Sequence, residues 1–150
     1  MSQTNKLYLV IDANVIGHTC HGPLDPKTWK AAQILCKILY DNHIVVLDIK
    51  VSNEDSILDE YSRQSKSELA KWWLIALRTE SNRISWRYKA NISIPALSDP
   101  DDQKYFQVAV NSPHKIIVSE DGDLGTIANH NDVISKGIAI WGFDTAVAKL

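Results

Sequence analysis

Cysteine and long apolar runs are both scarce in this sequence. Its 150 residues include 2 cysteines, Cys20 and Cys36, too few for a disulfide framework and typical of a protein from a reducing compartment. The apolar stretch 7–11 is shorter than the apolar segment of a signal peptide, and the stretch 72–77 is far too short to span a bilayer. These absences predict a cytoplasmic protein that makes no membrane contact.

Net charge is also small, at −2, which argues against a general polyanion binder. The charge is nevertheless uneven, because residues 61–90 are mainly basic and residues 91–125 mainly acidic. A basic segment that holds phosphates beside an acidic pocket that holds a cation is typical of a metal-dependent enzyme acting on a polyanion. Two solvated helix faces of opposite sign would give the same pattern. The candidate phosphate contacts are Lys71, Arg78, Arg83 and Arg87.

The chain has no internal repeat, linker or low-complexity tract, so we predict a single domain over residues 1–150. Short apolar runs rich in β-branched residues alternate with helical patterns, and this order predicts parallel strands joined by right-handed crossovers. Strands are expected at 7–11, 44–47, 84–88, 115–119 and 137–141. Helices are expected at 26–40, from Ser52 or Asn53 onward, at 67–79, from Pro100 onward, at 124–128 and at 144–150.

Acidic residues stand at several element boundaries. Asp12 follows the first strand, Glu60 lies in the helix after the second, Asp102 lies in a first helical turn, and Asp121 and Asp123 follow the fourth strand. Each alone also suits a turn, a helix dipole or a surface charge. The ends of the first and fourth strands would be neighbours if the sheet order reverses between them, which is where such folds bind ligands.

Carboxylates gathered at that point would repel one another and raise each other's pKa unless a cation neutralised them. Mg²⁺ and Mn²⁺ are hard ions that prefer carboxylate oxygens, and a water bound to them can attack a phosphodiester. No separate general base is then required, and no histidine stands beside these acids. His18, Cys20 and His21 lie close together, but their spacing fits no common zinc pattern.

Four blocks of the chain, in order, resemble the motifs of PIN domains. The first is an acid and an asparagine after a strand, the second a glutamate in a helix, the third an acid before an aromatic run, and the fourth a serine before an Asp-x-Asp. They are IDAN at 11–14, LDEY at 58–61, DPDDQKYFQVAV at 99–110 and VSEDGDL at 118–124. The match covers about residues 7 to 145. Gln107, in place of a small apolar residue, and the additional acid Glu120 depart from the family pattern.

The resemblance implies a three-layer α/β/α sandwich with a five-stranded parallel sheet of order 3-2-1-4-5. It also implies an Mg²⁺- or Mn²⁺-dependent endoribonuclease that cuts single-stranded RNA. Many relatives are toxins of VapC-like toxin–antitoxin pairs, so an antitoxin partner and a homodimer are implied as well. Carried over by position, the catalytic and metal-binding acids are Asp12, Glu60, Asp102 and Asp121, with Asp123 as a supporting ligand and Asn14 and Ser119 as orienting residues.

Two assignments stay open within this interpretation. Asp101 competes with Asp102, which we prefer because it precedes the aromatic pair by the family's interval. The chain is also compatible with a PIN-like module that keeps the acids but holds RNA or a protein partner without turnover. A phosphatase of the haloacid dehalogenase type would also begin with an acid after the first strand, but that chemistry usually needs a second acid where Asn14 stands.

Overall fold

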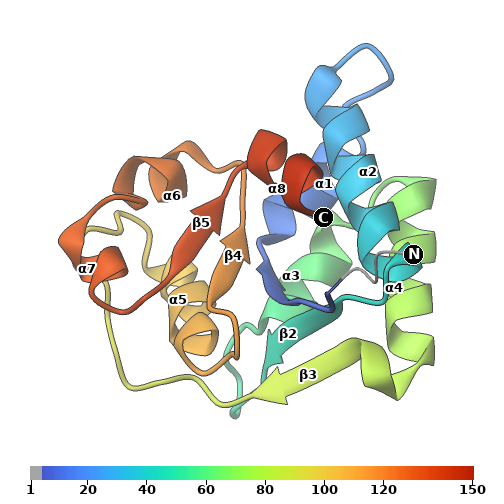
Figure 1. The fold of residues 1–150 in the computed structure, drawn as a ribbon. Helices are drawn as coiled ribbons and strands as arrows, with labels where there is room; N and C mark the ends of the chain where they lie inside the picture. The colour runs from blue at the N-terminus through green and yellow to red at the C-terminus, as the bar shows by residue number, and fades with distance from the viewer. Residues whose placement is uncertain (1–4) are drawn as a thin grey trace.

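The chain folds around a single parallel sheet (Figure 1). The computed structural model describes residues 5–150, apart from the side chains at positions 123 and 125. Within these residues the sheet has 5 strands in the order β3-β2-β1-β4-β5, and every neighbouring pair is parallel. The strands are β1 (Tyr8–Ile11), β2 (Ile44–Asp48), β3 (Ile84–Arg87), β4 (Ile116–Val118) and β5 (Ala139–Trp141). The predicted fold class and strand order are therefore confirmed.

Helices cover both faces of this sheet. One face carries the crossovers that join β1 to β2 and β2 to β3, together with the terminal helix: α1 (Ala13–His18), α2 (Pro26–Tyr40), α3 (Ile57–Gln64), α4 (Glu68–Thr79) and α8 (Phe143–Lys149). The other face carries α5 (Gln103–Val110), α6 (Gly122–Ile127) and α7 (Asn131–Ile134). Figure 1 shows α5, α6 and α7 on the left of the picture, α2 and α4 on the right, and α8 above the strands. Within the described part of the chain, no helix has the length and apolar character needed to cross a membrane.

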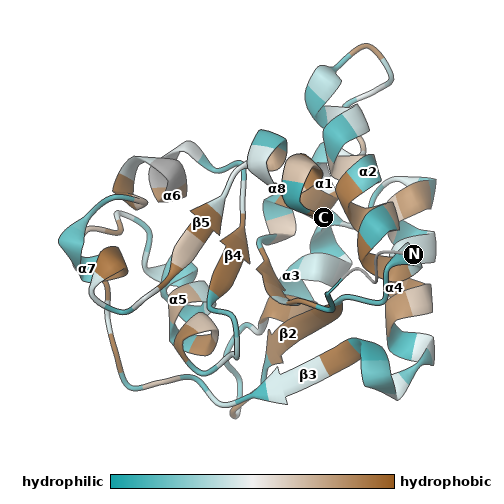
Figure 2. Cartoon of the chain, viewed as in Figure 1, coloured by the Kyte–Doolittle hydropathy of each residue, from teal (hydrophilic) through white to brown (hydrophobic). Residues whose placement is uncertain are grey.

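The central strands are buried on both faces. β2 and β4 are buried at every residue, and in β1 burial is complete from Leu9 to Ile11. Figure 2 shows β4 as hydrophobic along its length and β2 as hydrophobic over most of it, up to its last residue, Asp48, whereas the edge strand β3 is pale after its first residue. Because helices cover both faces of the sheet, its central strands appear in the sequence as unbroken apolar runs. The buried strands hold the residues at their carboxyl ends in fixed positions.

The start of α3 differs from the prediction. The helix begins after Ser56, not near Ser52, because Ser56 and Asp59 form a capping box in which each side chain accepts a hydrogen bond from the other's backbone N–H. Ser52 instead adopts a left-handed backbone conformation with φ of 55°. Glu54 and Asp55 consequently precede the helix and do not lie in its first turn. The reciprocal cap provides acceptors for two backbone N–H groups, whereas a single capping side chain provides an acceptor for one.

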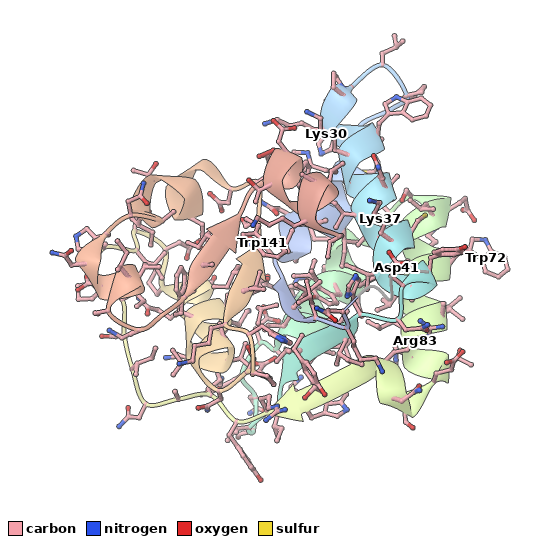
Figure 3. All side chains as sticks on the ribbon, in the orientation of Figure 1. Lys30, Lys37, Asp41, Trp72, Arg83 and Trp141 are labelled. Atoms are coloured by element: carbon pink, nitrogen blue, oxygen red, sulfur yellow. The ribbon has the colours of Figure 1, made fainter. Side chains whose placement is uncertain are left out.

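Two adjacent tryptophans of α4 have different environments in the structure. Trp73 is buried and its indole N–H donates to the Leu35 carbonyl at 2.9 Å, whereas Trp72 is 70% exposed. Figure 3 shows Trp72 projecting away from the rest of the molecule. Consecutive helical residues point about 100° apart, so the narrow apolar face of α4 accommodates one of the two rings.

Candidate metal centre

Asp12 lies at the point where the strand order reverses. Its backbone N–H donates to the Val118 carbonyl at 2.9 Å and so extends the pairing of β1 with β4 by one residue. Its carboxylate caps α1 by accepting from the Asn14 backbone N–H at 3.1 Å. The side chain is buried, with Asp12 only 5% exposed. Asp12 is therefore both a helix cap and an acid at the ligand-binding edge of an open parallel sheet.

Ser119 connects the loop after β4 to this carboxylate. Its hydroxyl donates to Asp12 Oδ2 at 2.8 Å and accepts from the Asp121 backbone N–H at 3.0 Å. Its own N–H is held by the Trp141 carbonyl of β5 at 2.9 Å. Ser119 thus orients the Asp12 carboxylate, and it also fixes the backbone that carries Asp121.

The acids at this edge influence one another electrostatically. The pKa of Asp12 is raised to about 6, mainly by burial. Hydrogen bonds from Ser119 and Asn14 lower it, and the charges of Asp121 and Glu60 contribute to the increase. Burial likewise raises the pKa of Asp102 to about 7, with the charge of Asp12 as the next cause, followed by the charges of other nearby acids. Ionising these carboxyl groups in the folded protein therefore costs free energy when no cation is bound.

The structure separates Asp102 from its rival Asp101. The two residues share a short 3-10 helix, Pro100–Asp102, which precedes α5. Asp102 is half-buried and its pKa responds to Asp12, Asp121 and Glu60, whereas Asp101 is exposed. Asp101 instead lines a neighbouring cavity of about 330 Å³. This placement favours Asp102 as the candidate ligand.

Glu60 is held by two residues of α5 that the sequence did not single out. The Lys104 ammonium forms an ion pair with Glu60 Oε1, and the Tyr105 hydroxyl donates to Glu60 Oε2. The same hydroxyl accepts from the Ala13 backbone N–H at 3.2 Å, directly after Asp12. Tyr105 lies within the third motif block but was assigned no role there, and Lys104 carried no signal in the spacing of the motifs.

A second buried acid, Asp48, was also missed. It ends β2 and is only 1% exposed, and its Oδ1 accepts from the Ile57 backbone N–H at 2.9 Å. Asp48 follows an apolar run, as Asp12 does, so the same sequence pattern of an acid directly after a buried strand predicts it as a candidate. In the structure it anchors the beginning of α3, the helix that carries Glu60.

The predicted phosphate contacts do not gather at the acids. Arg83 precedes β3, so it lies at the amino edge of the sheet, where it donates to the Leu39 carbonyl at 3.1 Å. Figure 3 shows Arg83 near Asp41, at the end of α2. Arg87 is the last residue of β3, in register with Asp48 at the carboxyl edge, but its guanidinium lies 6.0 Å from the centre of the Tyr8 ring, at the start of β1.

The other two candidates lie on α4, which runs between the two edges. This helix begins beside α1, because the hydroxyls of its cap Ser67 and of Thr19 are 2.6 Å apart, and it ends just before the 3-10 helix that leads into β3. Arg78, in its last turn, is therefore near the amino edge. Lys71, in its first turn, is the candidate on the side of the acids.

The side chains suit a hard divalent cation in their chemistry, but their geometry is incomplete. No three His, Cys, Asp or Glu side chains among those described are close enough together to hold a metal ion. The predicted supporting ligand, the side chain of Asp123, lies outside the described residues. The donors present are carboxylate oxygens at raised pKa, and Asn14 Oδ1 is buried without a hydrogen-bond partner among the described residues. A hard, oxygen-preferring cation would neutralise these charges.

No protein-family model, no curated protein and no solved structure matches the chain.

Replacing Tyr105 with phenylalanine tests the link between Glu60 and the strand end. The change removes the hydroxyl and leaves the buried Ala13 N–H without an acceptor, so we expect the free energy of unfolding to fall by about 1–3 kcal/mol. Urea unfolding followed by circular dichroism measures it. Tyr88→Phe is the matched control, because Tyr88 is largely exposed, and it should leave the stability unchanged. Equal stability of the two variants would contradict the assigned role of the Tyr105 hydroxyl.

Proposed function

We propose that the protein is an Mg²⁺- or Mn²⁺-dependent endoribonuclease that hydrolyses phosphodiester bonds of single-stranded RNA. The observation that carries the proposal is the placement of acids at the β1–β4 switch point, where burial first and the charges of neighbouring acids second raise the pKa of Asp12 and of Asp102. Buried acids whose charges disfavour one another mark a candidate functional site, and a divalent cation is the ligand that relieves their repulsion. The four PIN-like sequence motifs support the same function.

In this proposal Asp12, Asp102 and Asp121 would hold the cation. When bound, the cation would supply a water of lowered pKa and would stabilise charge on the phosphate oxygens. Ser119 orients the Asp12 carboxylate, and the Asn14 backbone N–H fixes its other oxygen. Lys71, in the first turn of α4, and Arg87, at the carboxyl end of β3, are the proposed phosphate contacts.

Cleavage of fluorescent single-stranded RNAs of mixed sequence tests the reaction. We expect products with Mn²⁺ or Mg²⁺, none after EDTA, and recovery when the metal is added back. Double-stranded RNA and single-stranded DNA of the same sequences should be cut more slowly. Intact RNA across the panel at millimolar Mn²⁺, with the protein folded, would contradict the proposal.

Substitution at the two neighbouring acids tests the ligand assignment. Asp102→Asn should lower the cleavage rate by more than about 100-fold, because substitutions even at outer-shell partners of metal ligands cost about 10–100-fold. Asp101→Asn should change the rate by less than about threefold, since Asp101 is exposed and lies in the adjacent cavity. Initial rates at fixed Mn²⁺ give both values. The reverse ranking would transfer the ligand role to Asp101.

A specific observation also favours the second candidate, a PIN-like module that binds RNA or a protein without turnover. Both oxygens of Glu60 are engaged by Lys104 and Tyr105, and within the described residues the acids form no ready metal-binding group. Persistent binding of labelled single-stranded RNA, with no cleavage under Mn²⁺, would establish this function in place of the nuclease. Cleavage abolished by EDTA would exclude it.

From the motif resemblance we also propose that the protein is a cytoplasmic, homodimeric toxin that an antitoxin inhibits. Induced expression in a bacterial host should arrest growth, and Asp12→Asn should remove the arrest. A small adjacent gene whose product has a DNA-binding half and an amphipathic tail should relieve it. Light scattering during size exclusion measures the oligomeric state directly.

A further inference from the structure

A groove between α3 and α4 continues to the edge strand β3. It consists of two cavities, of about 360 and 430 Å³, and Arg78 lines both. Lys71 and Leu74 of α4 line the first cavity, while Leu58 of α3 and Trp86 of β3 line the second. Lys71, Leu74 and Arg78 are spaced three and four positions apart, so they share one face of α4. The groove therefore follows this face along the helix to the sheet.

Both charged residues that line the groove are cations. Lys71 and Arg78 lie two helical turns apart, about 10 Å along the axis of α4. Within the described residues no acid lines either cavity, although the chain as a whole has a net charge of −2. Lys71 is exposed and its ammonium lies 3.6 Å from Glu68, whereas the guanidinium of Arg78 has no ion pair or hydrogen bond among the described side chains. The groove is therefore complementary to an extended anionic ligand.

Trp86 adds an exposed aromatic face to the groove. The residue is 48% exposed, and among the described side chains its ring stacks on no other ring and on no cation. A positively charged groove with an aromatic side chain is the combination that binds single-stranded nucleic acid, because the cations contact the backbone and a base stacks on the ring. Duplex RNA is recognised by its shape and its backbone instead, since its bases stay paired and stacked. The groove thus suits a single strand better than a duplex.

We propose that this groove binds single-stranded RNA, with a base stacked on Trp86 and with phosphates held by Lys71 and Arg78. The inference rests on the proposed function for the class of its ligand. Leu58, which lines the groove, lies in the first turn of α3, two positions before Glu60. The groove therefore reaches the helix that carries one of the candidate acids, and it is a region of substrate contact outside the reacting site.

Fluorescence anisotropy of labelled single-stranded RNA, with the full chain in EDTA, tests the inference under conditions that prevent metal-dependent cleavage. Arg78→Gln should weaken binding and lower the slope of log K against log salt by about 0.7, the value for one phosphate contact with a single strand. Trp86→Ala should weaken binding by about 5- to 150-fold at an unchanged slope, because one base loses its stacking partner. Trp86→Phe should keep most of the affinity.

Two exposed residues of α2 provide matched controls outside the groove. Lys27→Gln removes one cation and Tyr40→Ala removes one aromatic ring, and both variants should bind the RNA as the parent does. Circular dichroism verifies the fold of each variant. Arg78 is exposed, so Arg78→Gln and its salt slope decide the test even if Trp86→Ala does not fold. Duplex RNA of the same sequence should bind the parent more weakly than the single strand.

The outcomes separate this inference from the function on which it rests. Unchanged affinity in the groove variants, or no metal-free binding by the parent, would overturn the inference and leave the nuclease to its own test. Binding that depends on Arg78 and Trp86, without cleavage under Mn²⁺, would support the inference and overturn the nuclease. Duplex RNA bound as tightly as the single strand would overturn the stacking role of Trp86. Unchanged affinity with an altered oligomeric state would instead assign the groove to contact between copies of the chain.

Discussion

Asp12→Asn is expected to lower cleavage of single-stranded RNA by more than about 100-fold while the protein stays folded. Asparagine can still cap α1 through its one side-chain oxygen, and its amide NH2 can donate to the Ser119 hydroxyl oxygen, so we expect the fold to survive although the hydrogen bond with Ser119 reverses. What is lost is the negative charge at the centre of the cluster, and substitutions at outer-shell partners of metal ligands already cost about 10–100-fold. Initial rates at saturating Mn²⁺ measure the change.

The control for this variant is Asp144→Asn. Asp144 is an exposed acid of α8 that pairs with Lys30, so its substitution removes the same charge from a residue outside the proposed ligand set. Its cleavage rate should equal that of the parent. An Asp12→Asn protein that cuts RNA as fast as the parent would show that Asp12 takes no part in the reaction.

Asp12→Asn is also expected to change the free energy of unfolding. It should stabilise the protein at high pH, whereas most substitutions of buried residues destabilise it. The folded protein raises the pKa of Asp12 from 3.8 to about 6, which corresponds to about 3 kcal/mol in favour of the protonated form. This contribution is fully present below the unfolded pKa and is lost as the pH rises through the folded pKa. Without divalent cations, Asp12→Asn should therefore be more stable than the parent at pH 8 by about 3 kcal/mol, and similar to it at pH 4.

Urea unfolding in EDTA at both pH values measures this difference. Buried His43 has the opposite dependence, because burial lowers its pKa and its contribution is lost as the pH falls. His43 is present in both proteins, so its effect cancels in the comparison. Added Mn²⁺ should stabilise the parent more than the variant at pH 8. An equal difference in stability at pH 4 and pH 8 would contradict the strained-carboxylate interpretation of Asp12.

Much of the fold could be predicted because its signals are local. Each buried strand is an apolar run of a few residues, and the cap of α2 is an Asp-Pro pair, Asp25 and Pro26, that the structure confirms. The helix before β3 begins after Ser67, as the sequence indicated. The position of Asp12 at the carboxyl end of β1 follows from the same short pattern. The strand order, by contrast, came from the family resemblance and was confirmed by the pairing of β1 with both β2 and β4.

Four acids of the candidate site were proposed from the sequence, but their contacts were not. Asp12, Asp102, Asp121 and Glu60 were each found from element boundaries and motifs. The hydrogen bond between Tyr105 and Glu60 joins residues 45 positions apart in the sequence, and no local pattern encodes such a contact. The packing of α5 against the sheet beside α3 is what brings them together.

By itself the sequence determined where the strands end and which acids stand there, because apolar runs, turn residues and helix caps act over a few neighbouring residues. Only the tertiary structure decided that Lys104 and Tyr105 bind Glu60 and that Arg83 faces the opposite edge from Asp12. These facts depend on how helices pack on the sheet, which is set by the burial of the whole core. The acid after β1 is a local feature of the sequence, while its electrostatic environment belongs to the fold.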